Sequence, residues 1–351
     1  MSHLHVTAKK VSANMSNEQS SPPRVLITGG YGCIGAETAK WLIANTDSHV
    51  VICSRAVSAE RSDRVFGDVD ASCLTFLEAD VTDQARLQGI LTEHRISHVA
   101  HMAGLQTPDC NAHRNLGLQV NLAGTQNLIE AMKASGLPLQ RFVFASSAAV
   151  YGPRAAYPPG RVALSAEPQP VNVYGAWKLA GEHISRLFAD DTGIPTISVR
   201  PGALFGPGRD AGLTATPTTA LKHVALGRPY EIPYRSRQDY LYSPDVGAAV
   251  GNALVEPFTG YAAFTLPSHT VETSQFVSAI QAAAKELGIE GQCSITSGSD
   301  DVPFICDLDF EPFVKAFPRT PHTPFQQAVT QSLATFIDQV KKLGTLPGVE
   351  N

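Results

Sequence analysis

The sequence lacks several features that would place this chain in other classes of protein. Its six cysteines form no closely spaced pair of the kind that holds zinc. No run of about eighteen uncharged apolar residues is present, so we expect no membrane partner. The net charge of −5 includes no basic block, which argues against nucleic acid. Residues 1–22 are polar and lack the apolar core of a signal peptide, so we expect a disordered leader. These absences favour a cytoplasmic protein with reduced thiols, no metal and a small-molecule ligand.

A glycine-rich turn follows the first apolar run of the chain. The residues Thr28-Gly29-Gly30-Tyr31-Gly32-Cys33-Ile34-Gly35 connect the strand-like segment 25–27 to a segment of helical spacing. Gly29 permits the tight turn, Gly32 lets a phosphate approach the backbone, and Gly35 allows close packing of helix on strand. Amide N–H groups and the helix dipole can then hold a pyrophosphate. This context predicts a dinucleotide cofactor.

Strand-like and helix-like segments alternate along the first 200 residues, which is typical of a parallel sheet. We therefore predict an α/β fold with a Rossmann-type doubly wound parallel sheet and a smaller C-terminal α/β lobe. The dinucleotide-binding domain would comprise 23–200 and about 241–265, and the substrate-binding lobe 201–240 and 266–345 with the C-terminal helix. The expected strands after the first are 49–53, 74–78, 98–102, 141–145 and 196–200. The expected helices are 83–94, 116–135 and 171–191, with Gly136 and Gly193 ending the last two.

A second pattern adds chemistry to the predicted cofactor site. Tyr174 and Lys178 lie four residues apart at the start of a predicted helix, so their side chains share one face. The Lys178 ammonium can favour the ionised form of the Tyr174 phenol, which would make the phenol an acid or base near neutral pH. Ser147, at the carboxyl end of a predicted strand, would hydrogen-bond the substrate oxygen. These residues predict the catalytic group of an oxidoreductase.

Together these motifs resemble the extended short-chain dehydrogenase/reductase family, the group that holds NAD-dependent epimerases and dehydratases. The resemblance covers about residues 24–342. Besides the glycine turn and the catalytic pattern, it is carried by Ala79-Asp80-Val81, His101-Met102-Ala103-Gly104, the segments 145–152 and 200–208, and Phe317-Pro318-Arg319-Thr320-Pro321. The resemblance also implies a homodimer, formed through the helices at about 116–135 and 171–191.

The resemblance assigns roles to individual positions. It implies that Tyr174 is the acid/base, Lys178 its partner and a ligand of the nicotinamide ribose, and Ser147 the group that polarises the carbonyl. Asn121 would be a structural or proton-relay residue, and the alternative is a hydrogen bond to backbone within its helix. Asp80 would contact adenine, or else cap the following helix. The implied cofactor contacts are Gly29, Gly32, Cys33, Ile34, Gly35, Asp80, Val81, Met102, Ala103, Gly104, Tyr174, Lys178 and Pro201. The candidate substrate contacts are Gln106, Ser147, Ala148, Arg209 and Arg237.

At the end of the second predicted strand the chain departs from the family pattern. Many members carry an aspartate there for the adenosine ribose, whereas this chain has Ser54 and Arg55. A guanidinium beside a hydroxyl suits a 2′-phosphate, which favours NADP over NAD as the cofactor. The alternative is that Arg55 is solvated or stacks on adenine.

A second departure concerns the substrate. Nucleotide-sugar epimerases usually carry Arg-Asp-Tyr where this chain has Gln238-Asp239-Tyr240, with Arg237 one residue earlier. A neutral amide cannot replace a clamp on the substrate diphosphate, although Arg209 and Arg237 can bind a carboxylate or phosphate. Dehydration is disfavoured as well, because the acidic pair that it needs after the catalytic serine is replaced by Ala148 and Ala149.

We therefore expect an NAD(P)-dependent oxidoreductase that interconverts a secondary alcohol and a ketone on a sugar-like or polyhydroxylated small molecule. Within the same fold, the alternative is a sugar or nucleotide-sugar epimerase that retains its cofactor. A non-catalytic dinucleotide-binding sensor is the alternative outside the enzymes. The complete serine, tyrosine and lysine set argues against that last alternative.

Overall fold

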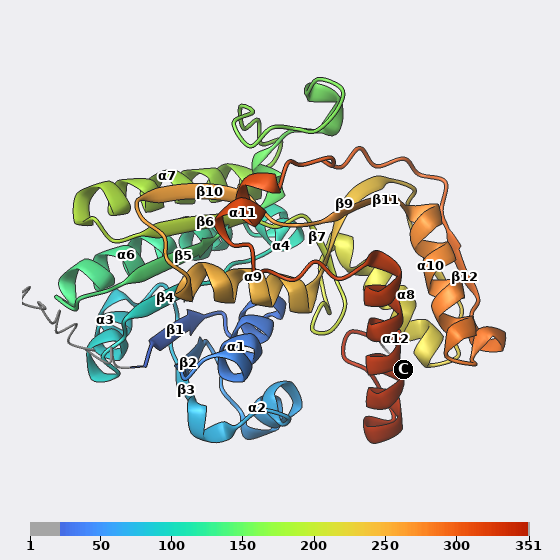
Figure 1. The fold of residues 1–351 in the computed structure, drawn as a ribbon, viewed down its shortest axis with the longest axis horizontal. Helices are drawn as coiled ribbons and strands as arrows, with labels where there is room; N and C mark the ends of the chain where they lie inside the picture. The colour runs from blue at the N-terminus through green and yellow to red at the C-terminus, as the bar shows by residue number, and fades with distance from the viewer. Residues whose placement is uncertain (1–21, 350–351) are drawn as a thin grey trace, which may run out of the picture.

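A parallel sheet of seven strands forms the larger part of the molecule (Figure 1). The computed structural model describes residues 22–349, so the predicted leader lies outside the described residues except for its last position. The strand order is β10-β6-β5-β4-β1-β2-β3, the doubly wound order with one further strand at an edge. The strands are β1 (Arg24–Thr28), β2 (His49–Ser54), β3 (Leu74–Glu78), β4 (His98–His101), β5 (Arg141–Ala145), β6 (Thr196–Arg200) and β10 (Tyr261–Thr265). The predicted Rossmann-type sheet is thus confirmed.

Helices cover both faces of this sheet, because its strands are apolar on both sides. On β1, Val25 and Ile27 belong to the core under one set of helices and Leu26 to the core under the other. The first set consists of α1 (Cys33–Asn45) and α9 (Ser243–Val255), with α2 (Ala59–Phe66) beside them. The second set consists of α3 (Gln84–Glu93), α6 (Gly124–Ala134) and α7 (Val173–Thr192). Both faces are therefore buried.

The helix predicted for 116–135 contains an irregularity that the sequence did not reveal. After α4 (Thr107–Ala112), α5 (Arg114–Leu118) leads into a π-helical turn at Gln119–Ala123 and then into α6. The predicted ends are correct, because Gly136 and Gly193 both have left-handed backbone angles, with φ of 63° and 72°. Short 3₁₀ turns lie at Ala71–Cys73, Ala148–Val150, Arg154–Ala156, Leu213–Ala215 and Glu290–Gln292.

A smaller lobe with its own core stands beside the sheet (Figure 1). Phe205, Tyr240, Phe276 and Phe336 are fully buried in it. It contains the sheet β11-β9-β7, formed by β7 (Ala203–Phe205), β9 (Arg237–Tyr242) and β11 (His269–Glu272), and the pair β8 (Tyr230–Ile232) and β12 (Ile295–Ser297). Its helices are α8 (Thr216–Ala225), α10 (Thr273–Glu286) and α12 (Phe325–Leu343), and α11 (Glu311–Ala316) lies back against β10. No helix among residues 22–349 has the length and apolar character needed to cross a membrane.

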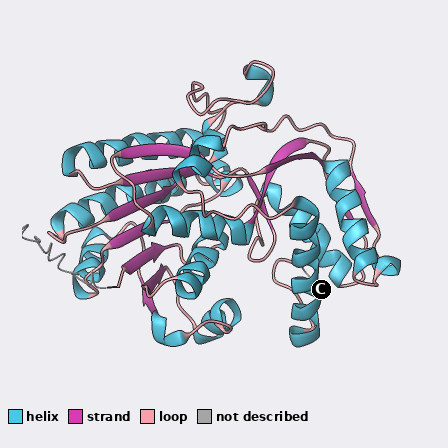
Figure 2. Cartoon of the chain, in the orientation of Figure 1, coloured by secondary structure: helices cyan, strands magenta, loops and turns pink. Residues whose placement is uncertain are grey.

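A long extended segment leads from the lobe back to the first sheet. In Figure 1 it is the orange segment that runs over the molecule from β12 toward α11, and Figure 2 draws it as a loop. We call residues 302–309 of this segment the strap. Its Val302 N–H donates to the Arg235 carbonyl of the lobe at 3.1 Å. At the other end the Asp309 N–H donates at 3.0 Å to the carbonyl of Val162, in the loop after β5. The strap thus joins the two parts of the molecule.

Candidate active site

The glycine turn has the geometry that a dinucleotide requires. Gly29 has a φ of +67°, and a Cβ there would lie 2.7 Å from the Ala103 backbone. A Cβ at Gly35 would lie 2.6 Å from the Gly29 carbonyl oxygen, so helix and strand pack as predicted. Gly32 caps α1 without any side-chain hydrogen bond, and the first turn contains no acidic residue. The first N–H groups and the positive end of the helix dipole therefore fit a pyrophosphate.

A cavity of about 550 Å³ opens from this turn at the carboxyl ends of the central strands. It lies where the strand order reverses between β1 and β4, which is where doubly wound sheets bind ligands. Of the predicted site residues, its lining includes Gly29, Gly32, Cys33, Ile34, Gly35, Met102, Gly104, Gln106, Ser147, Ala148, Tyr174, Lys178, Pro201 and Arg209. Those outside its lining are Ser54, Arg55, Asp80, Val81, Ala103, Asn121 and Arg237.

The start of α7 brings Tyr174 and Lys178 into the cavity. The Asn172 side chain caps the helix by accepting the Gly175 N–H at 2.9 Å. A Cβ at Gly175 would collide with the Ala149 carbonyl, so only glycine lets this turn approach the segment that carries Ser147. Ser147, Tyr174 and Lys178, which are up to 31 residues apart in the sequence, therefore line one cavity.

The pKa of Tyr174 shifts in the direction opposite to the one that we expected. Burial raises the pKa of Tyr174 above its ordinary value of 10.0, while the Ser147 hydroxyl and the charge of Arg209 oppose the rise. Lys178, which we expected to lower that pKa, instead donates to the Ala145 carbonyl at 2.7 Å. Its nitrogen lies 5.8 Å from the centre of the Tyr174 ring. Burial lowers the pKa of Lys178 from 10.5 to about 8.

Asn121 lies in the π-helical turn and holds the backbone beside the cavity. Its side-chain oxygen accepts the Leu105 N–H at 2.7 Å, and its amide donates to the Leu105 carbonyl at 2.9 Å. A Cβ at Gly104 would lie 3.2 Å from the Lys178 nitrogen and 3.3 Å from the Asn121 oxygen. These contacts fit the structural role, and the proton-relay role stays a prediction.

The residues predicted for the adenosine end lie beyond the cavity. Asp80 does not cap α3, because Asp83 does so by accepting the Arg86 N–H at 2.9 Å. Asp80 instead accepts the backbone N–H and the hydroxyl of Thr82 at 2.9 and 2.8 Å. The Arg55 side chain is exposed, with no hydrogen bond or ion pair to any residue that the structure describes.

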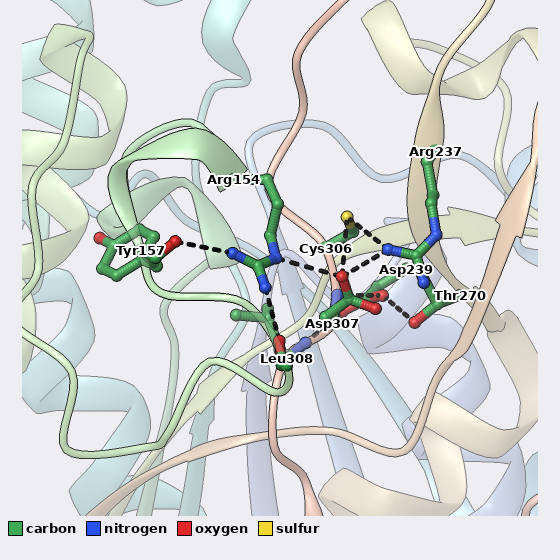
Figure 3. Close-up of polar contacts among 9 residues, drawn as sticks. Arg154, Tyr157, Arg237, Asp239, Thr270, Cys306, Asp307 and Leu308 are labelled. Atoms are coloured by element: carbon green, nitrogen blue, oxygen red, sulfur yellow. Dashed lines mark hydrogen bonds and ion pairs between the residues drawn. The ribbon is translucent and has the colours of Figure 1, made fainter.

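Arg237 does not line the cavity, contrary to its prediction as a substrate contact. Gln238 and Asp239 of β9 line the cavity, whereas the preceding Arg237 does not. The Arg237 guanidinium pairs with Asp307 of the strap, which also accepts Arg154 at 3.1 Å (Figure 3). Gln238 lines the cavity and donates to Ser236 and Tyr240 at 2.7 and 3.2 Å. Arg237 is thus engaged by the strap and lies outside the cavity lining.

Sequence reasoning missed two sets of residues around the site. Behind Ser147, the Arg200 guanidinium holds both oxygens of Glu182 at 2.7 and 2.6 Å, and Ser146 donates to the same carboxylate at 2.5 Å. A buried arginine at the end of a strand signals such a partner, although not which acid it is. The strap supplies Pro303, Phe304 and Ile305 to the cavity lining, without any sequence pattern that marks them.

The fold and the site define a Rossmann-type dinucleotide-binding protein that carries a tyrosine, a serine and a lysine beside the cofactor turn. The chain belongs to the NAD dependent epimerase/dehydratase family, whose model matches residues 25–263. This family is the one that the sequence motifs indicated.

The chain is similar to individual sugar-nucleotide epimerases and dehydratases. UDP-glucose 4-epimerase of Erwinia amylovora is 33% identical over 170 residues, which are 47% of this chain and 48% of that protein. The chain thus spans about half the length of that curated relative. dTDP-glucose 4,6-dehydratase of Neisseria meningitidis serogroup B is 25% identical over 306 residues, 81% of this chain and 82% of that protein. The structure of Thermus thermophilus UDP-glucose 4-epimerase in complex with NAD has a TM-score of 0.74 at 25% identity, covering 89% of this chain and 98% of that one.

Proposed function

We propose that the protein is an NAD(P)-dependent oxidoreductase that interconverts a secondary alcohol and a ketone on a sugar-like or polyhydroxylated small molecule. The observation that carries this proposal is the joint placement of Ser147, Tyr174 and Lys178 in the cavity that opens at the start of α1. A nicotinamide dinucleotide, when bound, supplies the carbon that accepts or returns a hydride. Gly29, Gly32 and the first turn of α1 would hold its pyrophosphate.

The chain's own residues would handle the proton. The raised pKa of Tyr174 keeps its phenol protonated at neutral pH, so the phenol can donate to a ketone oxygen. In the reverse direction the group must first lose its own proton, because only the phenolate can accept the hydroxyl proton, and the Ser147 hydroxyl and the Arg209 charge favour this phenolate by opposing the rise in the pKa. Ser147 would align the substrate oxygen. The Lys178 ammonium, held by the Ala145 carbonyl, would bind the nicotinamide ribose with its remaining N–H groups.

The second candidate function is an epimerase that keeps its cofactor bound, and it is favoured by the similarity to UDP-glucose 4-epimerases. Both functions begin with removal of a hydride from a carbinol carbon. An oxidoreductase then releases the ketone and the reduced cofactor, whereas an epimerase returns the hydride. Release or retention of the cofactor therefore separates the two functions.

The finer identity of the cofactor depends on Arg55. The Thermus thermophilus epimerase structure contains NAD. In this chain the exposed Arg55 guanidinium follows β2, where a 2′-phosphate of NADP would find a charge-assisted partner. We propose NADP as the preferred cofactor and NAD as the alternative.

We also propose a homodimer in the cytoplasm. Leu116 and Leu118 of α5 and Leu187 of α7 are large apolar side chains that remain 44%, 42% and 51% exposed. A second copy of the chain would bury them, with α7 and the α5–α6 segment of each protomer forming a four-helix bundle.

The test of the enzymatic proposal is a screen with a catalytic control. Polyols, sugar acids and nucleotide sugars are incubated with each nucleotide, and the absorbance of reduced nicotinamide is followed. Tyr174→Phe should keep the fold and cofactor binding but reduce turnover by about 10²–10⁴-fold, the contribution of a positioned acid or base. Tyr230→Phe, on β8 outside the cavity, is the matched control and should turn over normally. Near-normal turnover by Tyr174→Phe would refute the assignment.

A further inference from the structure

The charge of the cavity limits what the substrate can be. Among the described residues, Arg209 is the one arginine in the cavity lining, and Lys178 is the one lysine. Lys178 already donates to the Ala145 carbonyl and stands beside the catalytic phenol. Arg209 is therefore the cation that remains for the substrate.

Arg209 has no acidic partner among the residues that the structure describes. Its two terminal nitrogens donate to the neutral oxygens of Gln106 and Thr214 at 3.3 and 3.1 Å. The neighbouring Asp210 carboxylate is instead paired with Lys222 at 2.5 Å. The Arg209 Nε–H is buried and has no partner in the described part of the chain. Since a guanidinium has five N–H donors, this one carries both unused donors and an uncompensated charge.

The segment that carries Arg209 is fixed in place. Lys222, which is 2% exposed, ties Asp210 to the Pro347 carbonyl of the C-terminal segment at 2.5 Å on each side. Gly212, with a φ of +104°, closes over the side chains, and a Cβ there would collide with the Gln106 oxygen. Such fixed geometry is what a binding group needs, because little side-chain entropy is then lost when the ligand binds.

The rest of the lining offers little further charge for an anion. Gln238 is neutral, and Arg237 points away from the cavity to Asp307. Asp239 also lines the cavity, but its carboxylate already accepts Thr270 and two strap N–H groups. A substrate diphosphate or phosphate monoester carries about two negative charges, and one guanidinium compensates only one of them. A carboxylate matches Arg209 in charge and can accept two parallel N–H bonds from it.

We propose that the substrate is a small polyhydroxylated carboxylate, a sugar acid, whose carboxylate is bound by Arg209 with Gln106 and Thr214 holding the guanidinium. This inference rests on the proposed oxidoreductase function. In the oxidation, the carbinol carbon would lose its hydrogen as a hydride to a bound nicotinamide, and the hydroxyl proton would pass to the Tyr174 phenolate and from there to solvent. The electron pair of the broken O–H bond becomes the second bond between carbon and oxygen, which gives a keto acid. Arg209 would fix one end of the substrate while Ser147 and Tyr174 hold the reacting oxygen.

The experiment compares sugar acids with polyols of the same carbon skeleton. The probes are gluconate, galactonate and threonate against sorbitol, galactitol and threitol, with glucose 6-phosphate and UDP-glucose as further arms. Cofactor-loaded wild-type protein is used for kcat/KM and for calorimetric binding. We expect at least one sugar acid to exceed its polyol by about tenfold or more, since a charged hydrogen bond contributes about that much.

Variants of Arg209 test the same point. Arg209→Met should weaken calorimetric binding of that sugar acid by about ten- to a hundredfold without changing cofactor binding. Arg209→Lys should restore part of the loss because it keeps the charge. Arg235→Met removes the same charge from an exposed side chain outside the cavity and should behave as wild type. Preserved cofactor binding shows that the variants are folded.

The outcomes separate this inference from the proposed function. Turnover of polyols, glucose 6-phosphate or UDP-glucose in preference to sugar acids would overturn the inference and leave the oxidoreductase function standing. Binding of a sugar acid that depends on Arg209, without any redox reaction, would support the inference and refute the function. If no sugar acid binds, or if Arg209→Met weakens acid and polyol equally, the inference is wrong.

Discussion

At the scale of single residues, burial determines the chemistry of the cavity more than sequence spacing does. The spacing of Tyr174 and Lys178 places both side chains on one face of α7, yet Lys178 is turned to the Ala145 carbonyl. The two groups that oppose the rise in the Tyr174 pKa, Ser147 and Arg209, come from other parts of the chain. An apolar site disfavours both the phenolate and the ammonium. The protonation states of Tyr174 and Lys178 during the reaction therefore depend on the charges and hydrogen bonds that bound ligands bring into the cavity.

The buried ammonium predicts a pH-dependent stability. Lys178 has a folded pKa of about 8 against 10.5 in solution, so the unfolded chain binds more protons between these values. The wild type should therefore gain stability relative to Lys178→Met as the pH rises from about 8 toward 10.5, by about 3 kcal/mol in total. Urea unfolding at several pH values measures this difference. Lys341→Met, on the exposed surface of α12, should show no such trend, and a flat difference for Lys178→Met would show that burial does not lower the pKa of Lys178.

Cofactor choice is a second prediction at this scale. Arg55 is exposed after β2, so its charge would recognise one phosphate. We expect NADPH to bind more tightly than NADH, and Arg55→Ala to weaken NADPH by about ten- to a hundredfold while leaving NADH nearly unchanged. Titration by protein fluorescence checks this, with Arg64→Ala on the next helix as the control. Tighter binding of NADH, or equal weakening of both nucleotides, would show that Arg55 does not recognise the 2′-phosphate.

Among the secondary-structure elements, the sequence correctly predicted the strand bounds and helix ends that depend on nearby residues. The strands 74–78, 141–145 and 196–200 have the predicted bounds, because each is a short segment that contains β-branched or aromatic residues, which favour strands. The left-handed Gly136 and Gly193 end their helices as expected. The π-helical turn was missed because composition carries no signal for it. The strap was missed because its partners, Arg154 and Arg237, are far away in the sequence.

The ion pairs of Asp307 with Arg237 and Arg154 are expected to hold the strap against the cavity. Burial of Asp307 raises its pKa, but hydrogen bonds from Arg237 and Arg154 outweigh this effect and hold the pKa below 3.8. Asp307→Asn keeps a residue that tolerates the backbone φ of 60° and removes the charge that both guanidinium groups share. We expect faster proteolysis within 302–309, a raised KM and a stability loss of about 1 kcal/mol at neutral pH.

The pH dependence of that loss has a definite sign. A carboxyl with a lowered folded pKa stabilises the protein above its unfolded pKa of 3.8, and the contribution disappears as the pH falls through the folded value. The loss in Asp307→Asn should therefore be constant at neutral and mildly acidic pH and shrink below about 3.8. Glu311→Gln, which removes an exposed partner of Arg161, is the control. If both variants behave alike, the strap is not held by Asp307.

At the scale of the whole molecule, three separate sets of contacts position the cavity. The cores on the two faces of the large sheet hold the cofactor turn and α7, while the lobe's own core holds β9 and the segment of Arg209. The sequence indicated the large sheet and a lobe, since each element there follows a periodic pattern. It could not indicate how the lobe faces the sheet, because that depends on contacts between distant segments. Substrate residues were accordingly the least predictable part of the site.

The proposed dimer is tested at this scale as well. Leu187→Lys places a charge in the apolar surface of α7 and should shift the protein toward monomer, because an unpaired buried charge disfavours an interface. Leu343→Lys is the matched control, since Leu343 is 56% exposed on α12 and lies outside the proposed bundle. Sedimentation at several concentrations measures both variants. A wild type that is monomeric throughout, or a Leu187→Lys variant that stays dimeric, would refute this interface.

Transfer of an isotope from the substrate shows whether a hydride leaves the substrate in this cavity. The substrate found in the screen is deuterated at the carbon to be oxidised and incubated with the protein and oxidised cofactor. We expect mass spectrometry to find the deuterium in the released reduced nicotinamide, and Tyr174→Phe to slow this transfer by about 10²–10⁴-fold. Deuterium that returns to the sugar carbon with inverted configuration would identify the epimerase instead. Deuterium that stays in unreacted substrate, or exchanges into water, would contradict hydride transfer by this protein.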